Sequence, residues 1–110
     1  MRATRQRRQK TVEGGSRIVA IADAHLAAAT AERLAVSSSR FSVQYDVGLD
    51  DAHEVRMAAH RAKMAALEAE QAETDETAWA AARLAWAAVV SAREADARIS
   101  EAVVDRLMDS

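Results

Sequence analysis

Residues 52–72 read AHEVRMA AHRAKMA ALEAEQA, and residues 78–105 read AWAAARL AWAAVVS AREADAR ISEAVVD. In both stretches apolar residues recur at alternating steps of three and four, the spacing of coiled-coil helices that pack along a seam. The seams are Ala52, Val55, Ala59, Ala62, Ala66 and Ala69, and then Ala78, Ala81, Ala85, Ala88, Ala92, Ala95, Ile99 and Ala102. Because alanine lets two helix backbones approach closely, these seams predict an alanine-rich helical hairpin.

The residues between the two stretches predict a turn. Thr74, Asp75, Glu76 and Thr77 are typical of a helix end followed by a new N-cap, and the heptad phase breaks before the second stretch. Asp50 is suited to cap the first helix. We therefore predict helices over 50–73 and 77–108 that pack antiparallel. The alternative is one uninterrupted rod from 50 to 108.

Composition limits the class of protein. The chain has 110 residues with no cysteine, no proline and three glycines. It predicts a single all-α domain over 16–110 and excludes disulfides and thiolate metal sites. The longest apolar run, Leu84 to Val90, is too short to span a bilayer, and no apolar run follows the N-terminal positive charges as in a secretory signal. We expect no membrane partner and a location in the cytoplasm or within an assembled particle.

The region before the hairpin predicts a helix and then an extended segment. Ser16 is suited to cap a helix over 17–36 whose apolar face includes Ile18, Val19, Leu26 and Leu34, and the serines at 37–39 would end it. Over 40–48, large and polar residues alternate, which predicts one extended segment that pairs with another subunit or lies across helices. The predicted architecture is a three-helix unit dominated by the hairpin.

Several large side chains are candidates for contacts with a partner. Trp79 and Trp86 are one heptad apart in a segment that is apolar nearly all round, so it needs neighbours on several sides. Methionines opposite the first seam either pack between the other two helices or form an exposed docking surface. The predicted interface residues are Phe41, Val43, Tyr45, Val47, Met57, Met64, Trp79 and Trp86.

The N-terminus carries a concentrated positive charge. The net charge is −2, yet the first ten residues carry +5 from Arg2, Arg5, Arg7, Arg8 and Lys10, and the remainder carries −7. With Gly14 and Gly15 behind it, the segment 1–15 predicts a flexible basic arm. Its three possible roles are a solvated terminus, non-specific binding of a polyanion such as nucleic acid, and docking on acidic residues of a neighbouring subunit.

No catalytic, cofactor or metal site is predicted. His53 and His60 are seven residues apart, about 10.5 Å along a helix, too far to share one ion easily. The paired carboxylates lack any sign of a concave site that would shift their pKa values, and no nucleophile or phosphate-loop motif is present. We therefore expect that the protein is not an enzyme.

Residues 40–60 resemble ribbon-helix-helix DNA-binding proteins, because alternating residues at 41–47 precede a helix. That resemblance implies strands paired across a dimer and placed in the DNA major groove. The chain departs from the family pattern, since its predicted helix continues for about 24 residues where the family has a short helix and a turn.

Two functions are consistent with these observations. The first is a non-enzymatic helical structural protein that oligomerises or docks into a larger assembly, as a small component of a phage particle would. The second is a small DNA-binding regulator or architectural protein that uses the basic arm.

Overall fold

The computed structural model describes the backbone of residues 2–109 and the side chains of residues 16–109. The described backbone forms three helices: α1 (Arg2–Tyr45), α2 (Leu49–Gln71) and α3 (Asp75–Met108). No strand occurs within residues 2–109. The predicted all-α class is confirmed.

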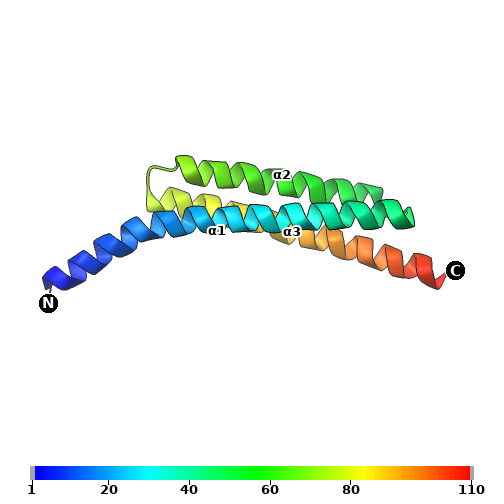
Figure 1. The fold of residues 1–110 in the computed structure, drawn as a ribbon, viewed down its shortest axis with the longest axis horizontal. Coiled ribbons are helices and arrows are strands. Elements are labelled where there is room, and N and C mark those ends of the chain that lie inside the picture. Colours follow the sequence, from blue (N-terminus) through cyan, green and yellow to red (C-terminus); the bar gives the residue numbers. More distant parts are fainter. Residues whose placement is uncertain (1, 110) are drawn as a thin grey trace.

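The three helices lie side by side in a rod of 70 × 25 × 14 Å (Figure 1). The chain reverses direction at the short connections 46–48 and 72–74, so α1 and α3 run the same way and α2 runs opposite to both. The N-terminal part of α1 and the C-terminal part of α3 project from opposite ends of the bundle (Figure 1).

Alanine fills the core of this bundle. Among the described residues, the buried apolar side chains are alanines from all three helices together with Val55, Val89 and Ile99. The seam positions predicted for α2 and α3 are buried, except that Ala59 and Ala102 are only partly covered. A methyl group removes little apolar surface from water. Stability therefore depends on close backbone approach along the whole length of the rod.

The buried face of α1 is not the one that the sequence predicted. Ile18, Val19 and Leu26 are 70%, 55% and 52% exposed. The buried face instead consists of small residues at steps of three and four, namely Ala20, Ala24, Ala27, Ala31 and Ala35. The prediction weighted the size of apolar side chains, but closely spaced helices leave no room for leucine or isoleucine between them.

The predicted helix end at residue 36 and the extended segment over 40–48 are also wrong, because α1 continues to Tyr45. Ser38 and Ser42 are fully buried and continue the small-residue seam. The Ser38 hydroxyl donates to Asp96 Oδ1 at 2.6 Å, and the Ser42 hydroxyl donates to the Val47 carbonyl at 2.5 Å. Serine is close to alanine in size, and these bonds satisfy its hydroxyl inside the bundle.

The alternation that suggested a strand has a helical explanation. Phe41 and Tyr45 are four residues apart on one helix face, and their rings stack with centroids 6.3 Å apart. Ser42 points inward between them, while Val43 is 77% exposed. The ribbon strand of the ribbon-helix-helix proteins is therefore absent at residues 41–45.

The connection from α1 to α2 is tight and rests on α3. Asp46 adopts a left-handed φ of 52°, and the Val47 amide donates to the Ser42 carbonyl at 3.1 Å, which is a Schellman-type helix end. Gly48, with a φ of 62°, precedes α2, so Asp50 is not the cap that the sequence predicted. A Cβ atom on Gly48 would lie 3.1 Å from Ile99 Cγ1. Glycine is therefore required here by both conformation and space.

The connection from α2 to α3 is a capped turn. Thr74 is the N-cap of α3, and its side chain exchanges hydrogen bonds with Thr77 in a capping box. The sequence placed the cap in this cluster, and the helix begins two residues earlier than predicted.

The N-terminal segment belongs to α1 by its backbone. α1 begins at Arg2, so Ser16 is not an N-cap, and the helix includes Gly14 and Gly15. The side chains of residues 1–15 lie outside the described part of the chain. The role predicted for the basic residues therefore stays a prediction.

Candidate interaction surfaces

The larger apolar side chains lie mainly on the outside of the bundle. The core takes alanine, and the exposed set comes from all three helices: Ile18, Val19, Leu26, Val36, Phe41, Val43, Leu49, Met57, Met64, Leu67, Leu84, Val90, Val104, Leu107 and Met108. Single exposed apolar residues are normal on a soluble protein, but rows of them along helices are typical of interaction surfaces. The candidate functional sites are therefore surfaces.

The two tryptophans join α3 to α1. Each is partly buried against the alanine core. Trp79 Nε1 donates to Ser16 Oγ, and Trp86 Nε1 donates to Asp23 Oδ2 at 2.8 Å. The acceptors are one heptad apart, as are the rings, which is the match expected for parallel helices. The neighbour that covers much of each ring is thus α1 of the same chain.

The methionine stripe, defined as His53, Met57, His60, Met64 and Leu67 of α2, is exposed. Of the two alternatives for this face, the structure shows the open surface, because α2 packs on both neighbours through its alanine seam. Beside the stripe, Met64 and Leu84 line a groove of about 370 Å³ between α2 and α3. Unbranched methionine side chains adapt readily to a partner surface.

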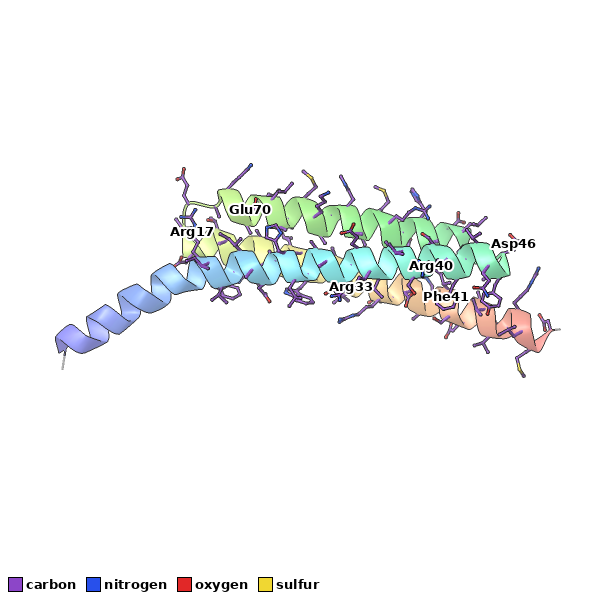
Figure 2. The ribbon with its side chains drawn as sticks, in the orientation of Figure 1. Arg17, Arg33, Arg40, Phe41, Asp46 and Glu70 are labelled. Atoms are coloured by element: carbon purple, nitrogen blue, oxygen red, sulfur yellow. The ribbon has the colours of Figure 1, made fainter. Side chains whose placement is uncertain are left out.

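The arginine groove, defined as Arg33, Val36, Arg40, Phe41, Val43 and Arg56, lies on the outer side of α1 and its border with α2. It comprises two adjoining hollows of about 830 and 610 Å³. Figure 2 shows Arg33, Arg40 and Phe41 on α1, in the half of the bundle that ends at Asp46. Arg56 Nη1 donates to Ser39 Oγ at 3.1 Å, which holds its guanidinium at the edge of the groove.

The arginine groove is positively charged. Three arginines face one carboxylate, that of Glu32, among the lining residues. Within the side chains of residues 16–109, neither Arg33 nor Arg40 forms an ion pair. Unpaired arginines around apolar side chains are suited to an acidic, amphipathic partner.

The C-terminal extension, defined as residues 100–108 of α3, continues beyond the other two helices. Ile99 is the last buried residue of the α3 seam, and Gly48 in the α1–α2 connection lies against it. The remaining nine residues project about 14 Å at helical rise. Val104, Leu107 and Met108 are exposed there, and Glu101 and Asp105 lie on the same part of the helix.

Polar contacts between α2 and its neighbours lie at the surface. Arg98 donates to Asp51 at 2.8 Å and to Glu54 at 2.6 Å, and the hydrogen bond to Asp51 raises the pKa of Arg98 above its ordinary value. His25 Nε2 lies 2.6 Å from Glu70 Oε1 across α1 and α2. These contacts fix the direction and register of the helices.

Neither a metal centre nor a membrane span is found in the described part of the chain. No cluster of three or more possible ligands among those side chains is arranged around one point. No helix there combines the length and the apolar character that a bilayer crossing needs.

The predicted interface residues fall into different environments. Val43, Met57 and Met64 are exposed, Phe41 is exposed beside Tyr45, and Val47 is partly buried in the connection. The basic residues Arg2, Arg5, Arg7, Arg8 and Lys10 have side chains outside the described part. Sequence reasoning missed the arginine groove, although Arg33 and Arg40 are one heptad apart and so share a helix face.

Comparison of the chain with protein-family models, with curated proteins and with solved structures finds no match. Any assignment of function therefore depends on the physical character of these surfaces.

Proposed function

We propose that the chain is a non-enzymatic helical assembly protein that forms a homo-oligomer, on its own or within a larger particle. The observation that carries this proposal is the inversion of side-chain size between inside and outside. Alanines occupy the core, while leucine, isoleucine, valine, methionine and phenylalanine side chains lie exposed along all three helices.

The energetic reason is the uneven distribution of burial. Folding the single chain covers mainly methyl groups, and fully burying a leucine or methionine contributes about 1.5 to 3 kcal/mol that the monomer does not gain. Association would supply this contribution. The long alanine-lined hairpin of α2 and α3, with α1 beside it, would serve as the rigid body that presents the outer surfaces.

The experiment is a measurement of mass in solution. Sedimentation equilibrium of the intact chain, from micromolar to near-millimolar concentration, should give a defined oligomer. A helical chain that stays monomeric throughout this range would contradict the proposal. Circular dichroism on the same samples separates a folded monomer from an unfolded one.

A second candidate is a small DNA-binding protein, which the charge of +5 in the first ten residues favours. Binding would be electrostatic and weakly selective, because that segment has no aromatic residue for base stacking. Removing residues 2–10 should weaken binding to duplex DNA and flatten its salt dependence, and should leave the oligomer unchanged. DNA affinity that is unaffected by the deletion would exclude this role for the arm.

A further inference from the structure

The further inference names the surface through which copies associate, and it rests on the proposed assembly function. Two unpartnered surfaces lie at the same end of the bundle: the arginine groove and the C-terminal extension (Figures 1 and 2). We propose that the C-terminal extension of one copy binds in the arginine groove of a second copy, and that the two copies exchange extensions reciprocally.

The first argument is that the extension has lost its own partners. Val103 and Leu107 continue the α3 seam one and two turns beyond Ile99, the last fully covered position. Leu107 is exposed because α1 and α2 end before it. A helix with apolar residues on such a projecting end gains burial only from another molecule.

The second argument is charge complementarity. Glu101 and Asp105 are four residues apart on the extension, and Arg33 and Arg40 lie on the groove. None of these four charges has an ion-pair partner among the side chains of residues 16–109. Carboxylates that approach the unpaired guanidinium groups form charge-assisted hydrogen bonds while the apolar residues pack between them.

The third argument is the geometry of exchange. The extension leaves the bundle at the end where the groove lies, so two copies that meet at this end with opposite directions place each extension over the partner's groove. Reciprocal exchange closes the assembly as a dimer and forms the contact twice. Doubling matters because a stable interface buries roughly 1,200 to 2,000 Å² in total, and one nine-residue helix face covers only part of that.

The test uses two charge-reversal variants of the full chain. One carries Arg33→Glu with Arg40→Glu, and the other carries Glu101→Arg with Asp105→Arg. All four residues are exposed, so each variant should keep its helical content. Each variant alone should dimerise about 100-fold more weakly or worse, since like charges then meet at both contacts. Mixed in equal amounts, they should recover the dimer, because both exchanged contacts are again complementary.

A matched control has Arg61→Glu with Arg83→Glu, which changes the net charge equally at exposed arginines outside the groove. It should dimerise like the unaltered chain. A chain that stops after Ser100 keeps Ile99 and should be monomeric and helical. Sedimentation equilibrium reads all of these samples, and native mass spectrometry identifies the mixed dimer.

The outcomes separate this inference from the proposed function. If the unaltered chain is dimeric and the charge-reversal variants remain dimeric, the exchange is wrong while the assembly function stands. If the unaltered chain is monomeric at every concentration, both are wrong, and the groove is then free for a different acidic partner. Larger open chains in place of a dimer would overturn the reciprocal exchange.

Discussion

The two ends of the interface between α1 and α3 solve the same packing problem in different ways. At the tryptophan end, Trp79 and Trp86 lie at the edge of the alanine core and donate to Ser16 and Asp23. At the serine end, Ser38 is inside the core and donates to Asp96. Large rings are thus accommodated beside the seam and small polar groups within it. Side-chain volume, more than hydrophobicity, decides which residue is buried here.

The largest expected effect comes from adding volume at the serine end. Ser38→Leu should lower the free energy of unfolding by about 1 to 3 kcal/mol, because a buried position between close helices has no space for leucine. Ser37→Leu is the matched control at an exposed position and should change it by about 0.5 kcal/mol or less. Urea unfolding followed by circular dichroism measures both. Equal effects at the two serines would mean that this stretch of α1 is not packed on α3.

At the tryptophan end, a loss of contact should have a somewhat smaller effect. Trp86→Phe removes the indole N–H that bonds to Asp23 and part of the ring surface, and should cost about 1 to 2 kcal/mol. A double-mutant cycle with Asp23→Ala isolates the hydrogen bond. The two substitutions should be non-additive, whereas Trp86→Phe paired with the distant Glu73→Ala should be additive. Additivity in the first pair would refute the bond between α1 and α3.

The connection at the serine end offers a test with opposite signs. Gly48→Ala should destabilise the chain by about 1 kcal/mol, because the left-handed φ disfavours a Cβ atom and Ile99 lies close. Asp46→Gly, two residues earlier, should stabilise it by several tenths of a kcal/mol, roughly, because glycine adopts that backbone region freely. Thermal unfolding of the two variants checks the signs. A shift in the same direction for both would contradict the Schellman-type turn.

The smallest effect is expected from the surface ion pairs. Arg98 bonds to Asp51 and Glu54, but its side chain is half exposed. Arg98→Ala should therefore lower Tm by about 3 °C or less, and added salt should reduce the difference. Calorimetry at low and high salt measures this. A larger, salt-independent loss would mean that the pair is more than a surface contact.

The sequence predicted the fold best where the seam is purely alanine. In α2 and α3 the steps of three and four indicate which residues are buried, and the threonine pair at 74 and 77 marks the turn. These signals are local and repeat several times, so single deviations such as Ala59 do little harm.

Prediction failed where small polar residues took the place of alanine. Ser38 and Ser42 interrupt the apolar pattern of α1, although their spacing of four residues continues the buried seam. Their helical state depends on Asp96 and on the Val47 carbonyl, contacts that local propensity does not contain. The same limit applies to the surfaces, since the arginine groove needs α2 beside α1 and the C-terminal extension is defined by where α1 and α2 end.

The central claim, that small side chains are buried and large ones exposed, is tested most directly at two neighbouring residues of α1. Leu26 is 52% exposed and Ala27 is fully buried. In urea unfolding at concentrations below self-association, Leu26→Ala should leave the free energy of unfolding within about 0.5 kcal/mol, whereas Ala27→Leu should lower it by about 1 to 3 kcal/mol. A large loss from Leu26→Ala together with tolerance of Ala27→Leu would contradict the account.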